Sequence, residues 1–253
     1  MDDGCLLAHV LCAAALTDAY GVEGIPVPLA LHNDDAMTCV LLLCAAAVAI
    51  GVARIKGVAA EQVKDFTYAA RDSRVPVIET AAEVRAQLLL AVQTCLLLAL
   101  LQYSYTLYYY IGEGAVSSSM HRAVAVYFGM FAVYFAARFA LYALVNNVFW
   151  TADRSAAFAK ALLFITAAES AALLPAVLLI AYVDLPARGV LAYVAVVIVC
   201  VKIMTFYKCY VIFFARRKAF VQNILYLCAL EGVPVAALWR AMGIAAENIT
   251  ANI

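Results

Sequence analysis

Long apolar stretches that charged residues rarely interrupt dominate this sequence. Six of them cover residues 36–53, 86–112, 123–150, 161–183, 189–215 and 219–239. An α-helix rises 1.5 Å per residue and needs about 20 residues to cross about 30 Å of hydrocarbon. The apolar runs are continuous rather than alternating, which excludes a transmembrane β-barrel. The sequence therefore predicts an all-α, polytopic membrane protein with six transmembrane helices.

The composition agrees with a membrane protein and excludes several other classes. Hydrophobic residues make up 68% of the chain and charged residues 13%, whereas soluble domains average about 45–50% and about 25%. The formal net charge is zero, so the chain lacks the basic surface that nucleic-acid binding requires. We expect the lipid bilayer to be the main partner and expect no nucleic acid.

The distribution of the 17 Lys and Arg residues predicts the orientation. Three lie inside the predicted spans, 11 lie in the segments 54–85, 151–160 and 216–218, and three lie on the other side. Cytoplasmic loops accumulate Lys and Arg, so these three segments are predicted to be cytosolic. Residues 1–35 carry six acidic and no basic residues. We therefore predict an extracytoplasmic segment 1–35, a transmembrane domain 36–239 with a cytosolic loop 54–85, an extracytoplasmic tail 240–253, and both termini outside.

Two shorter helices are predicted outside the spans. Residues 5–16 are apolar but too few to cross a bilayer, so we expect a short N-terminal surface helix. In the cytosolic loop, Val63 and Phe66 recur at helical spacing, which predicts an amphipathic helix on the inner leaflet. Thr80 and Glu83 form an S/T-x-x-E capping box that should begin the second transmembrane helix.

The cytosolic loop is also a candidate docking surface. It holds six basic and five acidic residues, a balance unlike the clustered Lys and Arg that recognise anionic headgroups. We predict that Asp65, Phe66 and Arg85 form a protein-facing surface, against the cytosolic ends of the bundle or against a membrane or cytosolic protein partner. The alternative is a solvated connector.

Five ionisable residues lie inside the predicted spans, where charges are costly and face protein or water. Counted from the cytosolic ends, Arg138, Lys202 and Glu231 lie about 18–20 Å deep, and Glu169 and Lys208 about 10–12 Å deep. The sequence thus predicts a deep layer, with an Arg138–Glu231 pair joined by Lys202, and a shallower layer. A structural ion-pair network and a pathway or ligand site both remain open.

Aromatic residues and prolines surround these charges. Tyr127, Tyr134 and Tyr142 are spaced to share one helix face with Arg138, where they could stack on or screen the guanidinium. Pro175 shares a predicted span with Glu169, and Pro234 lies three residues after Glu231. Kinked helices beside buried carboxylates occur in transporter sites and also in bundles that only pack.

Enzymatic motifs are absent from the sequence. It contains no G-x-x-x-x-G-K-[ST], H-E-x-x-H or G-x-S-x-G, and its three histidines are far apart. We therefore expect no enzyme activity, no metal and no cofactor. The favoured function is a non-enzymatic accessory or assembly protein. The alternative is a small transporter or permease that uses the intramembrane charges for an anionic substrate or for protons.

A resemblance to a known family adds to this interpretation. Residues 225–231 read L-Y-L-C-A-L-E and are followed by Pro234; this string resembles the C-terminal signature of an uncharacterised integral membrane family of Bacteroidetes, domain of unknown function 4271. Gly232 stands where that pattern has a bulky aliphatic residue. The resemblance implies a bacterial inner-membrane location, places Arg138 and Glu231 on matching positions, and carries over no catalytic residue.

Overall fold

The chain folds into helices throughout its described part. The computed structural model of the 253-residue chain describes residues 35–68, 80–111, 120–149, 151–183, 187–214 and 228–251. The long helices are α2 (Asp35–Tyr68), α3 (Ala81–Thr106), α4 (Met120–Phe149), α5 (Ala152–Tyr182), α6 (Ala187–Cys209) and α8 (Val233–Ala251). Short π-helices are η2 (Leu107–Ile111), η3 (Tyr210–Phe214) and η5 (Cys228–Gly232). These ranges contain no strand, which confirms the all-α prediction.

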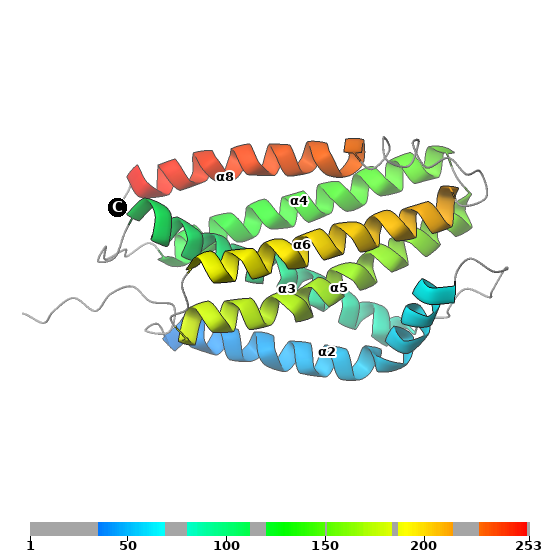
Figure 1. Ribbon diagram of the computed structural model, residues 1–253, viewed down its shortest axis with the longest axis horizontal. Helices are drawn as coiled ribbons and strands as arrows, with labels where there is room; N and C mark the ends of the chain where they lie inside the picture. Colours follow the sequence, from blue (N-terminus) through cyan, green and yellow to red (C-terminus); the bar gives the residue numbers. More distant parts are fainter. Residues whose placement is uncertain are drawn as a thin grey trace, which may run out of the picture.

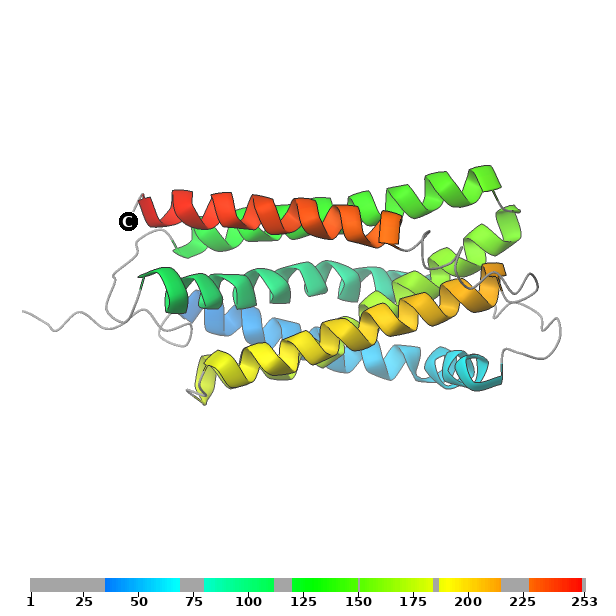
Figure 2. The same ribbon diagram turned by 45° about the horizontal axis from the view of Figure 1, so that its top comes forward.

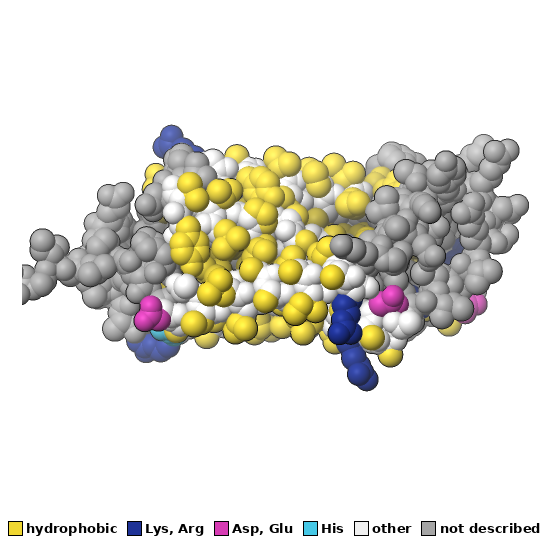
Figure 3. Space-filling view, turned by 90° about the horizontal axis from the view of Figure 1, so that it is seen from below, with side chains coloured by type: hydrophobic (Ala, Val, Ile, Leu, Met, Phe, Trp, Pro, Cys, Tyr) yellow, Lys and Arg dark blue, Asp and Glu magenta, His cyan; other side chains and the backbone are white. Residues whose placement is uncertain are grey.

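In the described part of the chain, six helices are long and apolar enough to cross a membrane. They are Asp35–Arg54, Ala81–Tyr109, Met120–Val148, Ala152–Tyr182, Arg188–Phe213 and Cys228–Asn248. They lie side by side in an elongated bundle (Figures 1 and 2). Apolar side chains cover the middle of one long face, while charged side chains lie toward its ends (Figure 3). These features support a multi-pass membrane protein, as predicted.

Some helices extend beyond the predicted apolar runs. Helix α5 begins at Ala152 rather than at residue 161, because its charged first turns continue the helix beyond the apolar run. Among the described residues, which resume at 228, the sixth candidate span is Cys228–Asn248, and α8 continues to Ala251. The predicted loop helix is continuous with α2, which reaches Tyr68. The predicted surface helix at 5–16 lies outside the described residues.

The start of α3 confirms the predicted capping box. The backbone N–H of Thr80 donates to Glu83 Oε2 at 2.7 Å, and the backbone N–H of Glu83 donates to Thr80 Oγ1 at 3.4 Å. These reciprocal bonds satisfy two amide groups that have no partner inside the helix. The second span therefore begins where the local sequence specifies.

Helix α3 is the most buried span, with half of its apolar window inside the bundle. Thr94 Oγ1 donates to the backbone oxygen of Thr166 in α5 at 3.1 Å, and Gln93 Nε2 donates to the backbone oxygen of Cys44 in α2 at 2.8 Å. Gly51 of α2 lies against the Leu90 side chain of α3. Polar contacts and close packing thus place α3 at the centre.

Helices α6 and α8 lie at the edges of the bundle against different neighbours. Helix α6 packs on α5, and α8 packs on α4. Pro175 lies inside α5, where its missing N–H leaves a carbonyl without its helical donor; the adjacent carbonyl of Ala172 accepts a hydrogen bond from Tyr193 of α6 at 2.9 Å. Because α6 and α8 pack on different helices, a side-chain contact between them links two separate parts of the bundle.

Candidate functional site: a buried charge network

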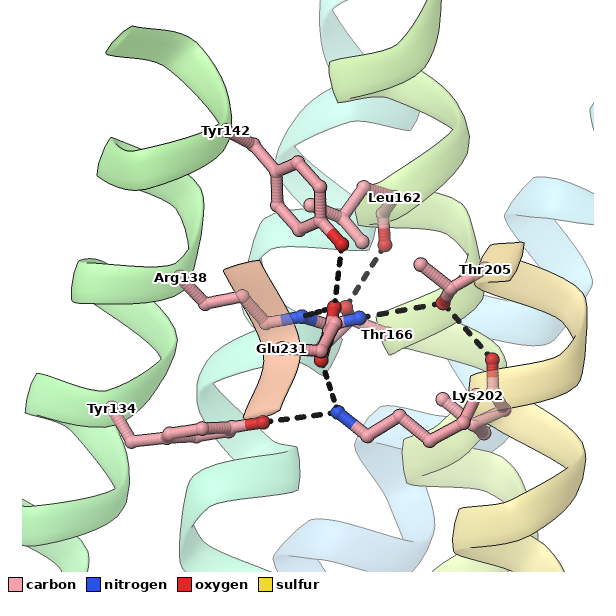
Figure 4. A network of polar contacts seen from close by, with 9 residues as sticks. Tyr134, Arg138, Tyr142, Leu162, Thr166, Lys202, Thr205 and Glu231 are labelled. Atoms are coloured by element: carbon pink, nitrogen blue, oxygen red, sulfur yellow. Dashed lines mark hydrogen bonds and ion pairs between the residues drawn. The ribbon is translucent and has the colours of Figure 1, made fainter. Parts of the chain in front are cut away.

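Arg138 stands at the centre of the network. It lies in α4 and is 1% exposed. Its Nε donates to Glu231 Oε1 at 2.6 Å, and its Nη2 donates to Thr205 Oγ1 of α6 at 3.3 Å. Figure 4 shows the guanidinium lying between the ribbons of these neighbouring helices. A single buried cation therefore joins three segments that are distant in sequence.

Glu231 is the common acceptor of the network. It lies in η5, is 8% exposed, and accepts from Arg138 Nε, from the Tyr142 hydroxyl at 2.9 Å and from Lys202 Nζ. Both carboxylate oxygens are used, Oε1 by Arg138 and Tyr142 and Oε2 by Lys202. The π-turn directly precedes a helix whose second residue is Pro234, which has no N–H to donate. Glu231 is thus held from α4 and α6 together.

Lys202 bridges the two edge helices. Its Nζ forms an ion pair with Glu231 and donates to the Tyr134 hydroxyl of α4 at 3.1 Å. Its side chain is 32% exposed, unlike that of Arg138. Figure 4 shows Lys202 and Arg138 approaching Glu231 from different sides. The most accessible charge of the network therefore belongs to Lys202.

The side chains of the predicted deep layer meet, whereas the shallower layer of Glu169 and Lys208 stays a prediction. Glu169 lies roughly 25 Å along α5 from Ala152, whereas Lys208 lies about 9 Å from the end of η3 at Phe214. Both residues are buried, and Glu169 lies within electrostatic range of Arg138 and Lys202.

Of the predicted partner surface, only the Arg85 side chain lies in the described part of the chain. Arg85 is exposed in the first turns of α3. Asp65 and Phe66 fall in the last turns of the α2 backbone, and their side chains lie outside the described residues. Whether the three form one surface stays a prediction.

Sequence reasoning identified the tyrosines and missed Thr205. Tyr134 and Tyr142 share the Arg138 face as expected, but they bond to the charges of other helices rather than stacking on the guanidinium. Thr205 is fully buried and also donates to the Val201 carbonyl at 2.9 Å. Its position three residues after Lys202, on the same helix face, was the signal that could have found it.

The chemistry of this network is that of charge pairing. Two cations share one carboxylate, so the three groups carry an excess of one positive charge. Across the described part of the chain, no group of three or more His, Cys, Asp or Glu side chains converges in a way that could hold a metal ion. The arrangement can hold helices together, and Lys202 can offer a partly accessible ammonium group to an anion.

Comparisons with known proteins give a family and no activity. A family model described as "Domain of unknown function (DUF4271)" matches residues 37–242. That range contains α3 to α6 and the entire charge network. No curated protein matches the chain, and no solved structure matches it.

Proposed function

Because this chain belongs to the DUF4271 family, which is described only as a domain of unknown function, we propose from its site that it is a non-enzymatic accessory or assembly protein of the bacterial inner membrane. The burial of Arg138, which is 1% exposed, carries this proposal. A substrate-binding arginine must be reachable, and the Nε and Nη2 groups of this one are bonded inside the protein.

The network has the properties of a device that fixes helix arrangement. Helices α6 and α8 pack on different neighbours, yet Lys202 of α6 and Arg138 of α4 both pair with Glu231, which directly precedes α8. Buried ion pairs contribute little net stability, but loss of one partner costs about 3–5 kcal/mol because the other charge is left unpaired. The network therefore penalises any other placement of η5 and α8.

Orientation and partner follow from the charge pattern. With the six candidate spans of the described residues, both chain termini would lie on the same side of the membrane, and the basic segments favour the extracytoplasmic side for them. The end of α2 and the start of α3, with Asp65, Phe66 and Arg85, would then face the cytosol and dock a protein partner.

The test compares single with combined substitutions. Glu231→Gln leaves Arg138 and Lys202 without a counter-charge and should destabilise the purified protein by about 3–5 kcal/mol. Replacing all three charged residues with Met removes the unpaired charges, so it should restore at least half of the lost stability. Arg240→Met, at an exposed position of α8, is the matched control and should have little effect.

The same variants separate the two functions. For an accessory protein, the triple-Met variant should insert, accumulate and retain the proteins that co-purify with the wild type in mild detergent. If the triple-Met variant is as stable as the wild type but has lost its cellular function, the proposal that the charge network is only structural is wrong.

A small permease is the second candidate, because the Lys202 side chain is 32% exposed at the middle of its span. Lys202→Gln keeps the buried Arg138–Glu231 pair. In an accessory protein this variant should retain function, whereas in an anion permease it should abolish uptake at normal abundance. Uptake by proteoliposomes containing wild-type protein is the direct measurement.

A further inference from the structure

A second buried carboxylate lies beside the network without joining it. Glu169 of α5 is 6% exposed, and among the described residues no donor bonds its Oε2. Ser170, the next residue, is fully buried and its Oγ also lacks a hydrogen-bond partner within that part of the chain. One turn of a central helix thus carries two buried oxygens whose hydrogen-bonding capacity is unused.

The neighbouring charges are committed elsewhere. The charged and titratable groups that act on Glu169 are Cys95 of α3, Arg138 of α4, Lys202 of α6 and Glu231 of η5. Arg138 donates to Glu231 and Thr205, and Lys202 donates to Glu231 and Tyr134. Both cations therefore compensate Glu231, and neither donates to Glu169.

A buried ionised carboxylate without a donor is costly, and the cost disappears when a proton neutralises it. A proton needs only one oxygen, whereas a bound metal ion needs several oxygen ligands. We propose that Glu169 is a proton-binding site, separate in role from the ionised Glu231. Its Oε2 takes one proton from a hydronium ion of the surrounding water: one O–H bond of the hydronium breaks and leaves a water molecule, one O–H bond forms on Oε2, and the carboxylate becomes a carboxylic acid.

This division of roles follows a general pattern in which two acids in different environments take different protonation states. It goes beyond a scaffold, because a proton held one turn from the Thr166 contact between α3 and α5 makes the core of the bundle sensitive to protonation. Proton-carrying Glu residues inside spans are typical of proton-linked membrane proteins.

The experiment is infrared spectroscopy of the purified protein in detergent. A protonated carboxylic acid has a carbonyl band above the amide region that ionised carboxylates lack. The wild type should show this band at neutral pH, Glu169→Gln should lose it, and Asp153→Asn should keep it. Asp153 is the matched control because it is an exposed acid in the first turn of the same helix.

Thermal unfolding supplies a second measurement. The Gln side chain resembles the protonated acid, so Glu169→Gln should keep the melting temperature of the wild type at neutral pH. In alkaline buffer the wild type should melt at a lower temperature than the variant, because only the wild type loses the proton. If Glu169→Gln does not accumulate, Glu169→Asp should shift the infrared band rather than remove it.

Two results would overturn the proposal. Identical carbonyl regions in the wild type and Glu169→Gln would show that Glu169 carries no proton. A melting temperature that rises with sodium or potassium, relative to a large organic cation, in the wild type but not in Glu169→Gln would assign the site to a metal ion.

Discussion

Replacing Tyr142 with phenylalanine should destabilise the bundle, and the same change at Tyr134 should have a much smaller effect. Both are tyrosines of α4 that bond to the charge network. Tyr142 is 2% exposed and donates to Glu231 Oε1 at 2.9 Å. Tyr134 is half-buried and accepts from Lys202 at 3.1 Å. The two positions therefore form a matched pair.

The magnitude follows from what each change leaves behind. Hydrogen bonds to charged groups contribute about 1.5–3 kcal/mol, and bonds between membrane helices reach about 1.7 kcal/mol. Glu231 Oε1 keeps Arg138 as a donor after Tyr142→Phe, so the acceptor is not orphaned and we expect a loss of about 1.5 kcal/mol. After Tyr134→Phe, Lys202 keeps Glu231 and the ring 5.8 Å away, so we expect less than about 0.5 kcal/mol.

Reversible unfolding in mixed micelles measures both changes. Phenylalanine at position 142 keeps the aromatic ring that packs against Phe158, whose ring centroid is 5.0 Å away. The measured loss of stability therefore reports the missing hydroxyl rather than a loss of packing. Combining Tyr142→Phe with Glu231→Gln should give less than the sum of the two effects, because the bond is already weakened. Equal losses at both tyrosines, or strict additivity, would refute the inference that the buried Tyr142 hydroxyl stabilises the bundle through its bond to Glu231.

The sequence was sufficient for the six spans and for the main charge pair, for different reasons. Spans follow from hydrocarbon thickness, which requires long apolar runs whatever the tertiary contacts. The pairing of Arg138 with Glu231 followed from charge complementarity, since an unpaired charge in a span is costly. Glu231 lies against Arg138 and Lys202, the two residues with which its predicted depth grouped it.

Other features depend on contacts that a single sequence does not contain. The start of α5 was expected at residue 161 because the charged first turns of this helix look like a loop when only hydropathy is considered. The use of Thr205 by Arg138 depends on side-chain rotamers and helix crossing, which hydrophobic periodicity leaves undefined. The π-turn at Glu231 could be connected with Pro234 only once the backbone was known.

Two further predictions concern packing and topology. A Cβ added at Gly51 would lie 2.8 Å from Leu90 Cδ1, whereas a Cβ added at Gly129 would have no atom within 4 Å. Leu90 is 2% exposed and has little room to move. Gly51→Ala should therefore lower the free energy of unfolding by about 1–3 kcal/mol, and Gly129→Ala should cause no measurable change. Equal effects would show that α2 moves freely on α3. For topology, an even number of spans places the segment between α2 and α3 opposite the C-terminus, and the basic residues of 54–85 favour the cytosol for that segment. A reporter active only outside the cytosol should therefore be active when fused at Ile253 and inactive when inserted between α2 and α3; activity at both positions would mean that the number of spans is wrong by one.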